Sequence, residues 1–226
     1  MRFEDLNWFD VEAYLQRDDR IMVILGACEQ HGYLSLLTDA KIPQVLADAA
    51  SASTGVLIAP PLNFGFSAYF QEYPGTITLR VETLTAVVED MIRSLYHAGF
   101  RRMLFLNGHG GNQPAMQKII ETANCYPDLK TAWYAWWQSH TCEAVARKYD
   151  LKPFHAAWSE NFPFVRVGDV PDIEKIPPSF QGMLNARQTR ELYGDGVFGG
   201  KYVAGDEIMQ DLFNELLKDV LQLLEF

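Results

Sequence analysis

The sequence has little cysteine, a shortage of positive charge and no long apolar run, and each of these excludes a class of protein. Its three cysteines form no Cys-x-x-Cys pair, so we expect reduced thiols rather than a disulfide framework. Nineteen Lys and Arg residues against 29 Asp and Glu residues give a net charge of −10, which argues against nucleic-acid binding. No apolar stretch reaches the roughly 18 residues of a membrane-spanning helix, so we expect no membrane association.

The first 20 residues carry six acidic side chains. A secretory signal peptide needs a basic start and an apolar middle, and this segment has neither, so we expect a cytoplasmic protein. The 226 residues, 48% of them hydrophobic, are enough for one domain with a substantial core. Because no repeat, low-complexity tract or linker divides the chain, we expect residues 1–226 to form a single domain.

Apolar segments along the chain alternate between strand-like and helix-like patterns. An alternation of this kind is typical of an α/β fold with a mainly parallel sheet and helices on both of its faces. The part from residue 155 to 205 is rich in Pro and Gly, and we expect it to be irregular and to wrap the active side. The predicted strands are residues 21–25, 56–59, 103–106 and 131–136, and the predicted helices are 44–50, 81–97, 114–123, 141–148 and 206–223.

Polar side chains follow two of the predicted strands. Glu29 and His31 come after the first strand with Asp39 close behind, and His109 follows another strand within the sequence NGHGGN. Ligands of such sheets bind just beyond the carboxyl ends of the strands. Imidazole and carboxylate together suit Zn, Mn or Fe. A bridging carboxylate can hold two ions about 3.5–4 Å apart, which activate a water and polarise a carbonyl.

Each motif also has a simpler interpretation. A Glu-x-His sequence in a loop is more often a surface segment than a metal site. His109 could belong to a plain strand-to-helix connector or to an anion-binding loop at a helix start. The occurrence of both motifs after strands favours the metal site. Gly110 and Gly111 would let the backbone approach closely and present N–H groups to an oxyanion.

These residues resemble the motifs of the creatininase (creatinine amidohydrolase) family. The sequence NGHGGN is the most specific match, and the matches run in family order from about residue 20 to 210. The matching segments are residues 29–32 with 38–39 (E-x-H-G…T-D), 73–76 (F-P-G-T), 107–112 (NGHGGN), 155–160 (H-A-G-x-x-E) and 196–199 (G-V-x-G).

The resemblance implies a three-layer α/β/α sandwich and a homo-oligomer, often a hexamer. It implies a metal-dependent amidohydrolase with two divalent ions per chain, Zn, Mn or Fe, in which metal-bound hydroxide cleaves a C–N bond of a small-molecule amide, cyclic amide or formamide. By position, Glu29 and His109 would bind one ion, His31 and Glu160 the other, and Asp39 would bridge them. Glu160 takes the place of an acidic ligand that creatininase proper has just after the NGH histidine.

Five further residues are candidates for the pocket around this centre. His155 matches the family histidine that shuttles a proton to the leaving nitrogen, and the ordinary histidine pKa of about 6.5 suits that role. Trp158 lies between His155 and Glu160 in the sequence, so we expect it to line the pocket. Ser67 could hydrogen-bond the substrate or cap a turn. Tyr69 and Phe70 could form an apolar wall.

The pocket motifs depart from the family pattern more than the ligand motifs do. The stretch G-P-H-L-P-L-G-T-D is one residue shorter here, at 32–39, and lacks its second histidine. Two aromatic residues stand where the family has Glu-His before the F-P-G-T turn, and H-A-G has become His-Ala-Ala at 155–157. We therefore expect a substrate other than creatinine. Two alternatives stay open: a non-catalytic metal-binding scaffold or small-molecule binding protein, and a C–C bond hydrolase acting on a cyclic diketone.

Overall fold

The computed structural model describes all 226 residues, and a four-stranded parallel sheet lies at its centre. The strands are β1 (Arg20–Leu25), β2 (Leu57–Ile58), β3 (Arg102–Asn107) and β4 (Lys130–Ala135), in the order β2-β1-β3-β4. Every neighbouring pair is parallel, so all four carboxyl ends meet at one edge. The predicted parallel sheet is confirmed.

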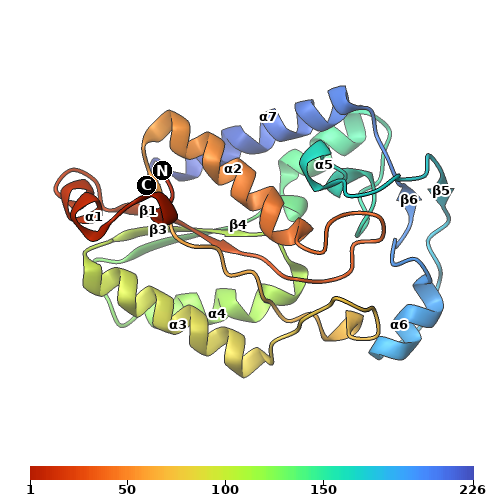
Figure 1. The fold of residues 1–226 in the computed structure, drawn as a ribbon, viewed down its shortest axis with the longest axis horizontal. Coiled ribbons are helices and arrows are strands. Elements are labelled where there is room, and N and C mark those ends of the chain that lie inside the picture. Colours follow the sequence, from red (N-terminus) through yellow and green to blue (C-terminus); the bar gives the residue numbers. More distant parts are fainter.

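Helices cover both faces of the sheet and make three layers (Figure 1). On one face lie α2 (Thr38–Thr54), α5 (His140–Lys148) and α7 (Asp206–Leu223), and on the other α3 (Val81–Ala98) and α4 (Gln113–Ala123). The α/β/α sandwich is therefore confirmed. None of these helices combines the length and the apolar character needed to span a membrane.

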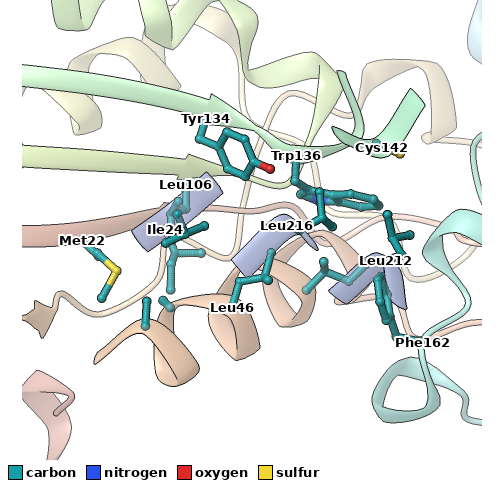
Figure 2. Packing of buried hydrophobic residues seen from close by; sticks show 14 of the residues in the cluster. Met22, Ile24, Leu46, Leu106, Tyr134, Trp136, Cys142, Phe162, Leu212 and Leu216 are labelled. Carbon is teal, nitrogen blue, oxygen red and sulfur yellow. The ribbon is translucent and has the colours of Figure 1, made fainter. Parts of the chain in front are cut away.

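The side chains of β1 show how the two cores are divided. Successive residues of a strand point to opposite faces, so Met22 and Ile24 enter one hydrophobic cluster and Val23 enters the other. Met22 and Ile24 share their cluster with Leu46 of α2 and Leu216 of α7 (Figure 2). A strand buried on both faces has to be apolar throughout, which explains the unbroken apolar run.

Three helices differ from the sequence expectations. Helix α2 begins at Thr38 rather than at residue 44, so Asp39 lies in its first turn and not in the preceding loop. The short helices α1 (Trp8–Leu15) and α6 (Ala186–Tyr193) were not predicted, although each begins with a capping box, at Asn7 and Asn185. An Asx residue followed three positions later by Asp or Gln was the pattern that could have revealed them.

The segment from 155 to 205 is less irregular than expected, because it contains α6 and a two-stranded antiparallel ribbon. The ribbon pairs β5 (Glu174–Lys175) with β6 (Gly200–Lys201). Figure 1 shows β5, β6 and α6 together beyond one end of the sheet, on the side where α2 begins. This segment therefore lies over the carboxyl ends of the strands, as the sequence predicted.

Candidate metal centre

Five titratable side chains converge at the carboxyl edge of the sheet. Glu29 and His31 follow β1, His109 follows β3, and Asp39 lies in the first turn of α2. Glu160 reaches them from the 3-10 turn Trp158–Glu160. Each of the five is at most 8% exposed. The structure thus brings together all five residues that the sequence nominated as metal ligands.

Asp39 lies between two histidines. Its Oδ1 is 3.0 Å from His31 Nε2, and its Oδ2 is 3.0 Å from His109 Nδ1. Glu29 Oε1 lies 3.5 Å from His109 Nδ1, and Glu160 Oε2 lies 3.6 Å from His31 Nε2. These five side chains therefore form two triads that share Asp39, and a third group joins Glu29 and His31 to His155. Within each group the candidate ligand atoms lie within 4.8 Å of one another.

The donor set fits a pair of divalent cations. Glu29 Oε2, His31 Nε2 and Asp39 Oδ2 are buried and form no hydrogen bond of good geometry, even though Asp39 lies close to both histidines. Buried polar atoms are normally paired, and leaving them unpaired is costly. Three carboxylates in so small a volume also repel one another, and bound cations relieve both costs. Two imidazoles and three carboxylates are ligands that suit Zn, Mn and Fe.

Backbone carbonyls orient both histidine rings. The Nε2–H of His109 donates to Phe66 O at 2.8 Å, which leaves Nδ1 free to face the carboxylates of its triad. His31 Nδ1 lies 3.4 Å from Glu29 O, so its Nε2 is the free nitrogen. Metal-binding histidines are commonly fixed in this way. A Cβ on Gly111 would lie 1.9 Å from Phe66 O, so the approach requires glycine at that position.

Two asparagines brace the loop that carries His109. Asn107 Oδ1 accepts from His109 N at 3.2 Å and from Asn112 Nδ2 at 3.2 Å, while Asn107 Nδ2 donates to His109 O at 2.8 Å. A Cβ on Gly108 would lie 1.8 Å from Asp39 O, so this glycine lets the loop approach α2. The sequence NGHGGN was the only indication of this bracing, and the asparagines had been given no role.

Glu160 is held by the chain just before it. Its Oε2 accepts from Ala156 N at 2.6 Å, and Ala156 has the left-handed conformation with φ 59. Burial raises the pKa of Glu160 to about 7, with the charge of His31 lowering it and that of Asp39 raising it. The carboxyl lies where the proposed ligand role requires it, although the regular elements of the fold do not place it there.

The charges of the cluster shift its pKa values strongly. Burial lowers the pKa of His31, but Asp39, Glu160 and Glu29 outweigh burial and raise it to about 10. The pKa of His109 is likewise raised well above its usual value against the effect of burial, by Glu29 and Asp39. Burial raises the pKa of Asp39, yet the two histidines hold it below its usual range. Near pH 7 the raised pKa values favour the doubly protonated form of both rings in the metal-free protein, and a cation that binds there has to displace the second proton.

A cavity of about 590 Å³ opens onto the cluster. Gly110 and Gly111 line it, as does Ser67, whose Oγ lies 3.4 Å from His109 Nε2. Tyr69 and Phe70 form part of an aromatic wall, as the sequence suggested. The wall also includes the aromatic residues Phe66, Trp137, Phe154, Phe180, Tyr193 and Phe198 and the apolar residues Met183 and Leu184, most of which lie in segments where the sequence offers no motif.

His155 stands in this wall, stacked on Phe70 at a centroid distance of 4.8 Å. Its ring centroid is 4.5 Å from that of His31. Burial and the neighbouring charge of His31 hold the pKa of His155 well below its usual value, so the ring is neutral near pH 7. The predicted catalytic histidine therefore faces the cavity beside the ligand cluster.

Trp158 lies elsewhere than expected. It is fully buried in the hydrophobic cluster that also holds Trp136 and Phe162, and its Nε1 donates to Lys152 O at 2.9 Å. The expectation rested on proximity in sequence to two site residues. Within the 3-10 turn, however, neighbouring side chains diverge, so Glu160 enters the site while Trp158 enters the core. Trp158 is therefore a core residue and does not line the cavity.

Comparison with known proteins identifies the family of this chain. The family model of creatininase, described as creatinine amidohydrolase, matches residues 4–224. The chain belongs to the creatininase family. Creatinine amidohydrolase of Pseudomonas putida is 31% identical over 126 residues, 53% of this chain and 48% of that protein. Mycofactocin precursor peptide peptidase of Mycobacterium tuberculosis is 35% identical over 111 residues, 44% of each. The chain spans about half the length of the curated relatives it matches.

Solved creatininase structures share the fold. The crystal structure of creatininase superposes with a TM-score of 0.81 at 21% identity, covering 98% of this chain and 95% of that chain. A manganese form and a Zn–Zn form of creatininase match with TM-scores of 0.79 and 0.81, each at 21% identity and over 98% of this chain, with 96% and 95% of theirs covered. At this identity the likeness establishes the α/β/α architecture.

Proposed function

We propose that residues 1–226 form a single catalytic domain, a metal-dependent amidohydrolase with a dinuclear centre. The observation that supports this is the pair of triads that share Asp39. Glu29 and His109 would hold one ion, His31 and Glu160 the other, and Asp39 would bridge them. The ions would be Zn, Mn or Fe, and related creatininase structures include Zn–Zn and Mn forms.

Bound there, the cations would supply an activated water and polarise the substrate carbonyl. The chain's own groups would complete the reaction. Gly110 and Gly111 line the cavity beside His109, where their backbone N–H groups would stabilise an oxyanion. His155, which lines the same cavity, would donate a hydrogen bond to the leaving nitrogen. The aromatic side chains would hold the body of the substrate and exclude water.

The substrate would be a small molecule with a C–N bond in an amide, a cyclic amide or a formamide. A cavity of about 590 Å³ is of the size that takes such ligands. The relatives bear names that refer to creatinine and to a precursor peptide, so the family's site accepts substrates of different shape. The aromatic wall favours a planar or apolar body for the substrate of this chain.

Metal analysis of protein purified without chelator tests the centre. We expect about two ions per chain, and His109→Ala should lose at least one of them. His97→Ala, which removes an exposed histidine at the end of α3, should keep both. Fewer than about one ion per wild-type chain would contradict the proposal of a dinuclear centre.

A substrate screen of the metal-loaded protein tests the reaction class. Cyclic amides, linear amides, formamides and cyclic diketones should be offered in parallel, with product formation followed by mass spectrometry. Turnover of an amide or formamide is expected. Cleavage of cyclic diketones alone would make the protein a C–C bond hydrolase, and ligand binding without any turnover would make it a non-catalytic member.

We also propose that the chain self-associates. Three apolar side chains of the segment over the sheet edge are strongly exposed: Ile173 by 52%, Ile176 by 88% and Met183 by 94%. Exposed apolar groups gathered in one segment commonly mark an interface. Light scattering after size exclusion should give a mass above the 25.7 kDa of one chain. A monomer mass would contradict this proposal and leave the metal centre unaffected.

A further inference from the structure

Gln30 lies between the ligands Glu29 and His31 in the sequence, yet its side chain turns away from the metal cluster. It is 5% exposed. Its Nε2 donates to Gly196 O at 3.1 Å, and its Oε1 accepts from Gly32 N at 3.1 Å. The same Nε2 lies 2.9 Å from His155 Nε2. The amide of Gln30 thus links the loop after β1, the turn at Gly196 and the histidine in the cavity wall.

The two backbone contacts fix which end of the amide faces His155. A carbonyl only accepts and a backbone N–H only donates. If the amide of Gln30 were rotated by half a turn, its oxygen would face Gly196 O and its NH₂ would face Gly32 N, so both contacts would become repulsive. The NH₂ group therefore points at His155, and His155 Nε2 must be the acceptor. A neutral ring with Nε2 unprotonated carries its hydrogen on Nδ1.

The hydrogen on His155 Nδ1 is available to a ligand. Nδ1 makes no hydrogen bond within the protein, and it is not among the buried polar atoms that lack a partner. The ring lines the cavity and is held flat against Phe70 at an interplanar angle of 13°. A substrate group in the cavity would therefore meet an N–H donor and not a lone pair.

We propose that Gln30 is a positioning residue that fixes His155 as a hydrogen-bond donor through Nδ1–H. His155 then serves the reacting nitrogen as a hydrogen-bond donor and not as a base, because Nε2 is occupied by the amide and Nδ1 already holds a hydrogen. The proton that the leaving nitrogen gains would come from the water that is consumed in the hydrolysis. The catalytic consequence rests on the hydrolase function proposed above. The hydrogen-bonding arrangement itself does not depend on that function.

The turn at Gly196 is built to receive Gln30. Gly196 has φ +89, and a Cβ there would lie 1.7 Å from Gln30 Oε1, so any other residue would displace the amide. Asp195 holds the turn from the other side: its Oδ1 accepts from Lys175 Nζ at 2.6 Å and from Val197 N at 3.2 Å. Glycine is thus required at this position by the side chain it accommodates as well as by its backbone angle.

The hydrogen position can be read directly by ¹⁵N NMR of histidine-labelled, zinc-saturated protein in the solid state, where particle size is no obstacle. Protonated and unprotonated ring nitrogens have well-separated ¹⁵N shifts, and the spectrum of His155→Asn assigns the His155 signals. We expect wild-type His155 to be protonated on Nδ1 alone. Protonation on Nε2 would overturn the proposal, and this measurement needs no variant of Gln30 to fold.

Gln30→Glu replaces the NH₂ donor that faces His155 Nε2 by an acceptor oxygen and keeps the size of the side chain. A carboxylate only accepts, so Nε2 of His155 should become protonated. Gln222→Glu makes the same chemical change at an exposed position of α7 and should leave the His155 signals unchanged. If Gln30→Glu is folded and its His155 signals match those of wild type, Gln30 does not set the hydrogen position.

Kinetics on an amide turned over by wild type then test the catalytic consequence. On the alkaline side of the pH profile, where the His155 ring holds a single hydrogen, Gln30→Glu should lower kcat on the order of 10²-fold with little change in KM or metal content, because that hydrogen then lies on Nε2 and the Nδ1 donor is lost. An unchanged kcat would overturn the positioning role even if the NMR result held. Absence of turnover in wild type would instead contradict the proposed function, with the NMR result still deciding the role of Gln30.

Discussion

The site is built from two regions that differ in how they are held. Glu29, His31, His109 and Asp39 come from the ends of β1 and β3 and from the start of α2. The strands pair in register with Leu25 opposite Asn107, so the segments after them leave the sheet side by side. The segment 155–205 over the sheet edge supplies Glu160, His155 and part of the aromatic wall, and its regular structure is limited to α6 and the short ribbon of β5 and β6.

Four of the five candidate ligands thus belong to the framework, whereas the covering segment (155–205) adds the fifth and contributes to substrate selection. Side chains at the ends of paired strands keep their relative positions while the sheet persists. A segment of turns can change length and composition without disturbing the sheet.

Glu160→Gln tests whether the covering segment also supplies a ligand. The amide keeps the size of the side chain but removes its charge, so the ion held by His31 should be lost. We expect metal content to fall from about two ions to about one and activity to fall by at least about 10²-fold. Mass-spectrometric metal analysis and kinetics would measure both. Glu174→Gln, in the same segment at an exposed position, should change neither, and two retained ions in Glu160→Gln would place the fifth ligand elsewhere.

Metal affinity should rise with pH. The pKa of His31 is raised to about 10 in the metal-free protein, so at pH 7 its ring carries a proton that the metal must displace. Each histidine proton released makes the apparent affinity about tenfold stronger per pH unit below that pKa. Glu160, with its pKa of about 7, adds to the dependence at lower pH. Competition with a chelator of known protonation constants would measure the apparent metal affinity between pH 6 and 8. An affinity that did not change with pH would contradict the protonated state of the cluster.

Phe180→Ala tests the wall. Phe180 lines the cavity and is 47% exposed, so truncation removes apolar contact with the substrate but little from the core. We expect KM to rise by about tenfold, equivalent to roughly 1.4 kcal/mol of lost contact, while kcat and metal content stay near wild type. The matched variant Phe9→Ala, at an exposed position of α1, should leave KM unchanged. A loss of metal in Phe180→Ala would contradict the claim that the wall can change without affecting the metal cluster.

Trp158→Phe should show the smallest functional effect. It removes the hydrogen bond from Nε1 to Lys152 O and part of a buried ring, so the free energy of unfolding should fall by about 1–3 kcal/mol with kcat and KM unchanged. Trp137→Phe is the counterpart, since Trp137 lines the cavity. It should change KM with less effect on stability. Urea denaturation and kinetics would be measured on both variants. If Trp158→Phe changed KM and Trp137→Phe did not, Trp158 and not Trp137 would line the pocket.

The sequence by itself determined the sheet, most helices and the candidate ligands that directly follow strands. A strand buried on both faces has to be apolar, and parallel strands have to end at one edge, so Glu29, His31 and His109 could be placed together from a one-dimensional pattern. Asp39 was nominated as well, although its place in the first turn of α2 was not foreseen. The family resemblance then added Glu160 and His155, which no periodicity could have located.

Only the tertiary structure decided what the turns do with neighbouring residues. Within three positions, Glu160 enters the cluster and Trp158 enters the core, because a 3-10 turn spreads its side chains in different directions. Gln30 and Gly196 are 166 residues apart, and their contact, which orients His155, has no trace in local sequence. The wall residues Phe180 and Met183 are likewise brought to the metal cluster by the path of an irregular segment. Such contacts depend on the packing of distant segments, which local propensity does not encode.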